Sequence, residues 1–466
     1  LLETQKTMLQ ALSPYFKPSR LADSKLQQAS DWIGVLGLYI FSFFSLLSIA
    51  GANLGLGLML IGLLLSSDAW RRLPRQFLFW SCLMIIAYIV YRGSEAMAEI
   101  PLDHKTQANQ ARDWALLFLF FIPAWWLSQS PRRIPTALGL ILTGFTLGIL
   151  SALDGDTLVQ LLQGERSGMH FGKPIIFGFD CAAVILGLIV LAIYRLNPQL
   201  KQNRIQQILL VVLIILGILF YTQGLIISQS RGVWLALFFA LPTIFLTLKF
   251  TRQSKKQPKV SLLMPLAAVG LVLALILALN WDTIQARVST EQTELGTVVS
   301  EGLDEAPLTA STYRLHLWEF GLNKWLERPF TGWGPGTTHA LVEAENNPNL
   351  KDHRDIGFDH LHNAYLEVVF QLGLLGIMII ALICGLMISK IMEAFRRQRI
   401  SIYFLAFLFS NFMLIAIYSL TDFRHLHWNW RFYWLIIAGS AYAFTLMTFR
   451  PHLERQYQSP KRRDDE

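Results

Sequence analysis

Charged residues are scarce in this sequence. Only 15% of its 466 residues are Asp, Glu, Lys or Arg, whereas 53% are hydrophobic. A soluble domain cannot bury that much apolar surface, and the apolar residues come in runs of about 20, the length that a helix needs to cross a bilayer. The composition excludes a soluble globular protein and predicts a polytopic helical membrane protein.

Cysteines are few as well. The three cysteines, Cys82, Cys181 and Cys384, all lie within apolar runs. This pattern argues against a disulfide framework and a cysteine-based zinc site, so we expect the thiols to pack among helices. The N-terminal segment also lacks the compact apolar region of a cleaved signal peptide.

About twelve apolar runs are candidate membrane spans. No stretch between them has the composition of a separate soluble domain, and no internal repeat is evident. We therefore expect an all-α protein. Its predicted spans lie near residues 31–50, 52–66, 76–92, 113–128, 134–152, 174–194, 205–229, 232–250, 261–281, 365–389, 401–420 and 430–449.

Positive charge marks one set of loops. If the N-terminus is cytoplasmic, every inner segment is basic, from "SSDAWRRLPRQ" at 66–76 to the C-terminal tail, as the positive-inside rule requires. The net charge of +8 then reflects membrane topology and anionic lipid rather than nucleic acid. The predicted organisation is a cytoplasmic segment 1–30, spans one to nine in 31–281, a periplasmic loop 282–364, spans ten to twelve in 365–449 and a cytoplasmic tail 450–466.

The long periplasmic loop has helical segments of its own. In "STYRLHLWEFGLNKWLERPF", residues 311–330, apolar side chains recur at helical spacing: Leu315, Trp318, Leu322, Trp325 and Leu326. We expect an amphipathic helix on the membrane surface or on the bundle, capped by Ser311 or Thr312 and ended by Pro329. A glycine–proline turn and a second short helix follow in "FTGWGPGTTHALVEAE", residues 330–345.

Titratable residues gather where this loop meets the tenth span. "FDHLHN", residues 358–363, contains Asp359, His360, His362 and Asn363, and in the predicted orientation it faces the outer side. A neutral imidazole there can accept a proton from an attacking hydroxyl. Two other interpretations stay open: His362 is an ordinary interfacial histidine, or the two histidines bind a metal with Asp359 or His353.

Arginines lie on the same side of the membrane. Arg231 stands at the nearly loopless joint of two spans, and Arg287 and Arg314 belong to the long loop. An arginine at a span end can simply extend to lipid headgroups. A buried cation, however, points to an anionic partner, and the guanidinium fork suits phosphate. Arginines, histidines and apolar helices together suit an enzyme that acts on a lipid-linked phosphate.

Three sequence blocks carry a family resemblance. "SQSRGVWLA", "STYRLHLWEFGLNKWLERPFTGWGPG" and "HLHNAYLEVVFQLGLLG" follow one another across residues 228–376. In this order, with one large loop before the tenth span, they resemble the Wzy_C family of bacterial membrane proteins. That family contains O-antigen ligases, Wzy-type polymerases and O-oligosaccharyltransferases that glycosylate proteins.

The resemblance implies a mechanism for these residues. Ligases of the family have a GT-C-like fold and transfer a finished polysaccharide from undecaprenyl diphosphate to a lipid A-core hydroxyl at the periplasmic face of the inner membrane. They use no nucleotide or metal cofactor. Arg231 and Arg314 match the family's diphosphate-binding arginines, and Arg287 matches in a shorter context. His362 matches the essential histidine and proposed general base, and His360 would orient it or bind acceptor. We also expect Asn363, which directly follows His362, to be one of the substrate-binding residues.

Three alternatives remain at this point. A polymerase would use a second lipid-linked glycan as acceptor. A protein O-oligosaccharyltransferase would glycosylate a polypeptide, although the short basic tail is unlike the longer periplasmic portion that such enzymes often carry after the last span. A transporter or flippase would need polar residues in the middle of several spans, whereas these spans read as almost purely apolar.

Overall fold

The computed structural model describes most of the chain between Lys25 and Met447. Within that range it leaves out residues 101–103, 156, 158, 160–164, 197–202, 301, 305, 346 and 352–359. Between 251 and 295 it describes only Ala278, Trp281, Gln285 and Ser289.

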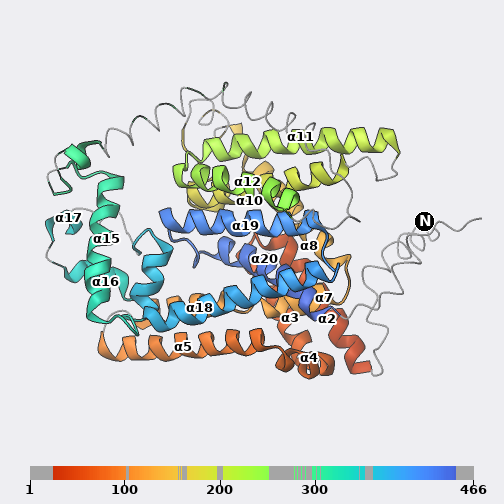
Figure 1. The fold of residues 1–466 in the computed structure, drawn as a ribbon, viewed down its shortest axis with the longest axis horizontal. Coiled ribbons are helices and arrows are strands. Elements are labelled where there is room, and N and C mark those ends of the chain that lie inside the picture. Colours follow the sequence, from red (N-terminus) through yellow and green to blue (C-terminus); the bar gives the residue numbers. More distant parts are fainter. Residues whose placement is uncertain are drawn as a thin grey trace, which may run out of the picture.

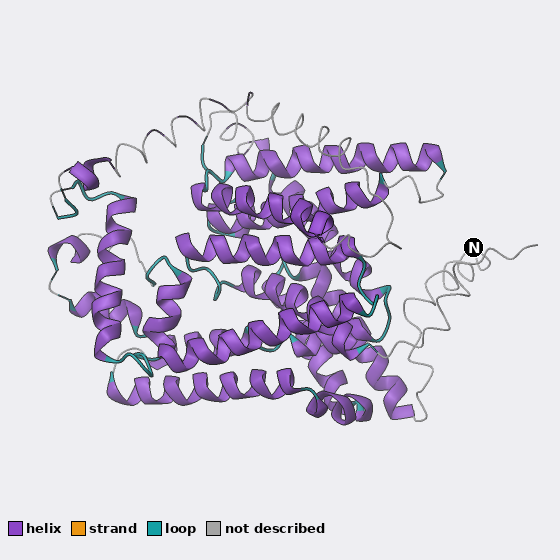
Figure 2. Ribbon diagram, in the orientation of Figure 1, coloured by secondary structure: helices purple, strands orange, loops and turns teal. Residues whose placement is uncertain are grey.

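The described part is helical, without a strand (Figure 2). Its longer helices lie roughly side by side in one bundle (Figure 1). In chain order the helices are α2 (Lys25–Phe44), α3 (Ile49–Leu65), α4 (Ser67–Arg72), η1 (Leu73–Arg75), α5 (Phe77–Glu99), α6 (His104–Leu116), α7 (Phe121–Ser128), α8 (Arg133–Ala152), η2 (Met169–Phe171), α10 (Pro174–Arg195), α11 (Arg204–Ile227), α12 (Arg231–Phe250), α15 (Ala310–Glu327), α16 (Thr338–Ala344), α17 (Pro348–Lys351), α18 (Ala364–Arg396), α19 (Ile402–Thr421) and α20 (Trp428–Leu446).

Several of these helices are long and apolar enough to cross a membrane. Among the described residues there are 7, or up to 8 if the bent pair Ile49–Leu65 and Ser67–Arg75 counts as one span. The prediction of an all-α, multi-pass membrane protein is confirmed. The predicted run 261–281 lies almost entirely outside the described residues, so the count of twelve spans stays a prediction.

One predicted span is two helices. The run 113–128 begins inside the polar helix α6 and ends with α7, and the residues between them, 117–120, form turns. α6 starts as early as His104 because "HKTQANQARDW" is a good helical sequence, although it is too polar for lipid. α7 is buried along its length by neighbouring helices, α20 above all.

The helices of the long loop form a cap over one end of the bundle. We use "cap" for α15, α16, α17 and the first part of α18 up to Leu372, at the left of Figure 1. The cap has its own apolar core, separate from that of the bundle: Tyr313, Leu317, Phe320, Val342, Leu350, Leu361, Leu366 and Phe370.

The predicted helix of the loop is present, but two details were wrong. Its N-cap is Thr309, which forms a reciprocal capping box with Thr312, because the helix starts before Ser311. Its buried face is that of Tyr313, Leu317 and Phe320, whereas Leu322 and Leu326 of the predicted apolar stripe are exposed. The face of α15 that packs into the cap core is therefore not the apolar face that was predicted from the sequence.

α18, predicted as one continuous span, is interrupted at Gly373. This residue has φ 64° and ψ −170°, a conformation that favours glycine. The amides of Trp333 and Gly334 donate to the carbonyls of Phe370 and Gln371 at 2.8 Å each, so the turn at 329–334 replaces the missing helical bonds. The apolar run in the sequence gives no sign of this break. Backbone groups at a break in a membrane helix must find partners elsewhere, and here the partners lie in a turn that is distant in sequence.

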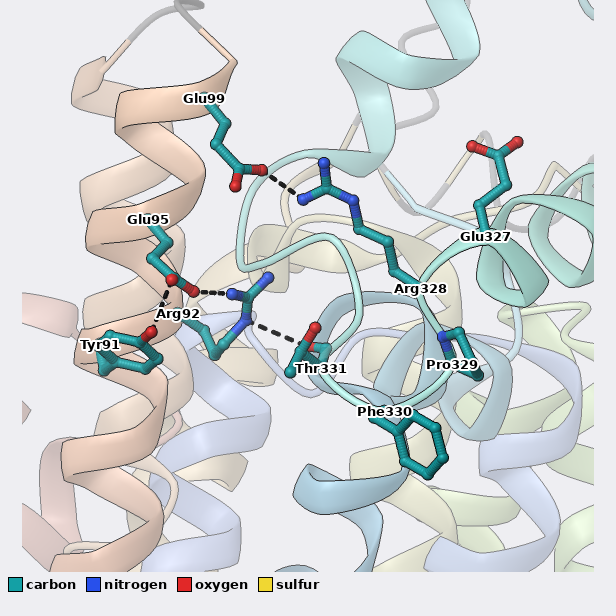
Figure 3. A pocket seen from close by; sticks show the side chains of 9 residues that line it. All are labelled: Tyr91, Arg92, Glu95, Glu99, Glu327, Arg328, Pro329, Phe330 and Thr331. Atoms are coloured by element: carbon teal, nitrogen blue, oxygen red, sulfur yellow. Dashed lines mark hydrogen bonds and ion pairs between the residues drawn. The ribbon is translucent and has the colours of Figure 1, made fainter.

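α5 holds the same turn from its other side. The Arg92 guanidinium donates to the carbonyls of Thr331 (3.1 Å) and Gly332 (2.7 Å), and it pairs with Glu95 (Figure 3). Figure 3 also shows Arg328 of the turn directed at Glu99 of α5. Arg92 and Arg328, which line this shallow pocket of about 410 Å³, thus fasten the cap to α5 of the bundle.

The spans are less purely apolar than the sequence indicated. A cavity of about 610 Å³ between α8, α10, α19 and α20 has Asp180, Asn411 and Tyr433 in its otherwise mostly apolar wall. Asp180 is 1% exposed, and its carboxyl oxygens have no hydrogen-bond partner among the described residues. One polar residue in a long apolar run is inconspicuous until the fold brings several such residues together.

Candidate active site

The histidine motif lies at the junction of the cap and the bundle. The carbonyl of Leu361, between the two histidines, accepts a hydrogen bond from Trp318 Nε1 of α15 at 2.9 Å. α18 begins directly after the motif, and the Asn363 side chain caps it by accepting from the amides of Tyr365 and Leu366 at 3.0 and 3.1 Å. Asn363 therefore has a clear structural role, and the amide NH₂ is the group it has left to offer a substrate.

His362 is paired with a carboxylate that the sequence analysis did not single out. Its Nδ1 lies 3.0 Å from Oδ1 of Asp422, the residue that ends α19, and the two residues are 2% and 1% exposed. Since an ionised carboxylate can only accept, Nδ1 carries the proton and Nε2 carries the lone pair. A histidine held in this tautomer by an aspartate is suited to accept a proton through Nε2.

His360 is held in the opposite tautomer. Its Nδ1 accepts a hydrogen bond from the backbone amide of His362 at 3.2 Å, so its proton sits on Nε2. That nitrogen is buried and has no hydrogen-bond partner among the described residues. His360 thus offers a donor rather than a base, and the two histidines that look alike in the sequence have different chemistry.

The surroundings keep both imidazoles neutral and the aspartate ionised. Burial lowers the pKa of His362, and the nearby cations Arg314 and Arg424 lower it further, which outweighs the opposing effect of Asp422. Burial, His362 and Arg424 hold the pKa of His360 well below its ordinary value. Burial alone would raise the pKa of Asp422, but its hydrogen bond to His362 and the charge of Arg424 lower it below its usual range.

Two of the three predicted arginines lie at this site's end of the bundle. Arg314 is one helical turn before Trp318 on α15, and its charge acts on His362. Arg231 is the first residue of α12. The next residue, Gly232, packs closely on Thr421, because a Cβ added to Gly232 would lie 2.3 Å from the Thr421 hydroxyl oxygen. Because Thr421 precedes Asp422, α12 begins beside the His362–Asp422 pair. The third, Arg287, lies outside the described residues.

The structure adds cations that the sequence analysis missed. Arg424 approaches Asp422 with Nε at 3.5 Å from Oδ2. Lys173, which directly precedes α10, helps to lower the pKa of His360. Together with burial, Arg424 and Lys173 also lower the pKa of His427 to about 4. Positive charge therefore reaches the site from the cap, from the start of α10 and from the loop between α19 and α20.

The donor set also fits a divalent cation by residue type. His360, His362 and Asp422 offer ligand atoms that all lie within 4.8 Å of one another. Imidazole and carboxylate suit zinc and related ions, but a metal would have to displace the bond between His362 and Asp422. Asp359 and His353, the additional ligands considered from sequence, lie outside the described residues. A metal-binding role thus remains an alternative to the histidine base.

A weak signal for Asp422 and Arg424 is present in the sequence. They belong to "TDFRH", which directly follows the predicted span 401–420 at its outer end. Asp422 lies 60 residues from His362, and only the antiparallel arrangement of α18 and α19 brings the two together. Both residues share this position, directly after a predicted span, with no other sequence feature that connects them to the histidines.

Comparison with known proteins agrees with the sequence resemblance. Residues 216–381 match the family model Wzy_C, described as O-antigen ligase. The search of curated proteins found no match. The matched region contains Arg231, Arg314, His360 and His362, whereas Asp422 lies beyond it. Residues 216–381, about a third of the chain, are thus similar to the Wzy_C domain of O-antigen ligases, and they belong to a multi-pass membrane protein.

Proposed function

We propose that this protein is an O-antigen ligase that moves a polysaccharide from undecaprenyl diphosphate to a sugar hydroxyl of lipid A-core. The observation that carries the proposal is the buried His362–Asp422 pair among cations from several elements. A base tautomer and clustered positive charge are what glycosyl transfer from a diphosphate requires.

The acceptor hydroxyl attacks the anomeric carbon of the donor glycan. Its proton passes to Nε2 of His362, and the imidazolium formed is stabilised by Asp422 through Nδ1. The bond between the anomeric carbon and the phosphate oxygen breaks, and its electron pair leaves with the diphosphate. Attack from the opposite face inverts the anomeric configuration.

The cations neutralise the leaving diphosphate. Arg231, Arg314 and Arg424 are the candidates for this role, and Arg287 is a further candidate from sequence. Because a neutralised diphosphate leaves readily, no protonating acid is needed. Nε2–H of His360 can donate to a substrate oxygen, which fits a substrate-binding role rather than that of a second base.

Transfer by purified protein tests the role of His362. With lipid-linked glycan as donor and lipid A-core as acceptor, His362→Gln and His362→Ala should lower the rate by about 10²–10⁴-fold, the usual range for general-base help. His339→Gln, at a partly exposed histidine of the cap, is the matched control. A fully active His362→Gln enzyme removes the base role. Loss of activity in EDTA, restored by a divalent ion, would favour the metal alternative.

A deletion strain separates ligase from polymerase. We expect polymer to be missing from lipid A-core and retained on the carrier lipid. Single repeats on the core would identify a polymerase instead, and loss of glycan from a protein would identify an O-oligosaccharyltransferase.

We also propose that the site faces the periplasm from the inner membrane. The basic loops support this orientation, with the cap outside and both termini cytoplasmic. Thr297→Cys should react with an impermeant thiol reagent applied from outside, whereas Ser459→Cys should not. Labelling of Thr297→Cys from the cytoplasmic side only would contradict the orientation.

A further inference from the structure

Leu361, between the two histidines, is held at both of its backbone polar groups. Its amide donates to Oε2 of Glu367 at 2.7 Å, and its carbonyl accepts from Trp318 Nε1 at 2.9 Å. Its side chain is fully buried against Gly321 of α15. The residue that separates the two histidines therefore cannot shift without losing contacts to α15 and α18.

His362 itself has a backbone conformation that needs such support. Its φ is 52°, in the left-handed region that residues other than glycine rarely adopt. Residues in such conformations persist where the surrounding structure fixes them, and they cluster at functional sites. The hydrogen bonds and packing that fix Leu361 therefore act on the residue directly before His362.

Glu367 is the centre of the network that provides this hold. It is 0% exposed, and its Oε1 accepts hydrogen bonds from the Thr338 hydroxyl at 2.6 Å and from Gln371 Nε2. The Gln371 amide is oriented in turn by Trp114, whose Nε1 donates to its Oε1 at 2.7 Å. A carboxylate suits this position because it accepts only, and three neutral donors converge on it.

We propose that Glu367 is a positioning residue for the transfer reaction, which holds the Leu361 backbone so that His362 faces Asp422 with Nδ1 and the acceptor hydroxyl with Nε2. The inference rests on the proposed function, because it takes His362 as the base. Glu367 touches neither substrate nor reacting atoms in this scheme and acts only through the backbone of the motif.

Substitutions at Glu367 separate this role from simple loss of structure. Glu367→Ala leaves the Leu361 amide without its acceptor and frees the motif. We expect kcat to fall about 10–100-fold, since small misplacements of a catalytic group cost that much, while KM for the lipid-linked donor changes less than about twofold. Glu367→Gln keeps one oxygen for Leu361 but turns an NH₂ toward Thr338 and Gln371, so its kcat should lie between those of the wild type and Glu367→Ala. Glu393→Ala, near the other end of the same helix, is the matched control and should behave like the wild type.

The activity must be expressed per molecule of protein that still binds the donor lipid. We would normalise kcat to the stoichiometry of donor-lipid binding and record the pH profile of kcat/KM. A displaced His362 should move the acid limb of that profile, whereas a smaller fraction of folded protein lowers the whole profile without moving it. Unchanged normalised kcat and pH profile in Glu367→Ala would overturn the inference.

A second variant covers the case in which Glu367→Ala does not fold. Trp318→Phe removes the donor to the Leu361 carbonyl, keeps an aromatic ring against the cap core and leaves Glu367 in place. It should lower normalised kcat by about 3–10-fold with donor KM unchanged. Wild-type kcat and pH profile in this variant would show that the hold on Leu361 does not matter. A fully active His362→Gln enzyme, by contrast, would remove the base role of His362 on which the inference rests. Polymer still present on lipid A-core in the deletion strain would remove the proposed function itself, so the failures are distinguishable.

Discussion

α18 has a glutamate near each of its ends, and the two have opposite surroundings. Glu367 in the first turn is fully buried and accepts from neutral donors of three segments. Glu393, close to the last turn, has a side chain 40% exposed and pairs with Lys390 and Arg397, whose side chains are 40% and 59% exposed.

This difference shows which charged residues indicate a structural or chemical role. Exposed pairs like those of Glu393 contribute about 0–1 kcal/mol each to stability. Burial of an ionisable group costs free energy, so each buried one at the cap end is a candidate for a structural or chemical role that can be tested. Paired substitutions at the two ends make this comparison quantitative.

The largest contrast should come from two aspartates. Asp422→Asn removes the negative charge that stabilises the His362 imidazolium, although its amide oxygen can still accept from Nδ1 and from the amide of Phe423. Transfer should fall by about 10²–10⁴-fold with the protein still folded. Asp68→Asn, in the first turn of α4 at the opposite end, should leave the rate unchanged. Equal rates for the two variants, measured with purified components, would remove the role given to Asp422.

Two arginines provide the next contrast. Arg231→Ala should reduce transition-state stabilisation by about 2–4 kcal/mol, a loss of about 30–1,000-fold in rate, and weaken donor-lipid binding. Arg231→Lys keeps the charge without the fork and should also be impaired. Arg397→Ala, at an exposed position of the other end, should change neither quantity. Near-normal transfer by Arg231→Ala at normal expression would assign this arginine to lipid headgroups.

Two glycines of α18 test the cap end by stability rather than by activity. At Gly373, with φ 64°, an added Cβ would come 2.3 Å from the carbonyl oxygen of Phe330. Gly373→Ala should therefore cost about 1–3 kcal/mol and lower the thermal unfolding temperature. A Cβ at Gly385 meets nothing within 4 Å, and Gly385→Ala should be neutral. Identical melting curves for the two variants would mean that the break in α18 is not fixed by the turn at 329–334.

The pH dependence should show the smallest effect. The base is active when neutral, so kcat/KM falls as pH drops through the pKa of His362. Burial and the neighbouring cations lower that pKa, which moves the acid limb below the ordinary histidine value of about 6.5. Between pH 7.5 and 6.5 the rate should thus fall by less than the half expected for an ordinary histidine. An acid limb above pH 6.5 would mean that His362 is solvated or is not the titrating base.

Much of the helical framework was predictable, because long apolar runs are direct evidence of spans. The predicted runs 174–194 and 401–420 match α10 and α19 to within about one residue. The break at Gly373 was not predictable, because it depends on bonds to a turn 40 residues away in the chain, from Trp333 to Phe370 among others. The buried face of α15 was missed for a related reason, since the cap core that selects it is assembled from distant segments.

The candidate site was predictable where its residues are close in sequence. His360 and His362 stand out in "FDHLHN" and Arg314 in the loop helix, and the structure places them together. Asp422 and Arg424 belong to a different segment, and no local pattern connects them to the histidines. Nor could the sequence tell the two imidazoles apart, because their tautomers are set by a backbone amide on one side and a carboxylate on the other.

The turn at 329–334 has a consequence for how the chain is assembled during synthesis. Its contacts with Arg92 join it to α5, which leaves the ribosome earlier, whereas its contacts with Phe370 and Gln371 join it to α18, which leaves later. The cap therefore cannot be completed when its own residues emerge, and it waits for the insertion of α18. Until then these amides lack their acceptors in α18, and chaperones or proteases would meet an unfinished cap at this stage of biogenesis.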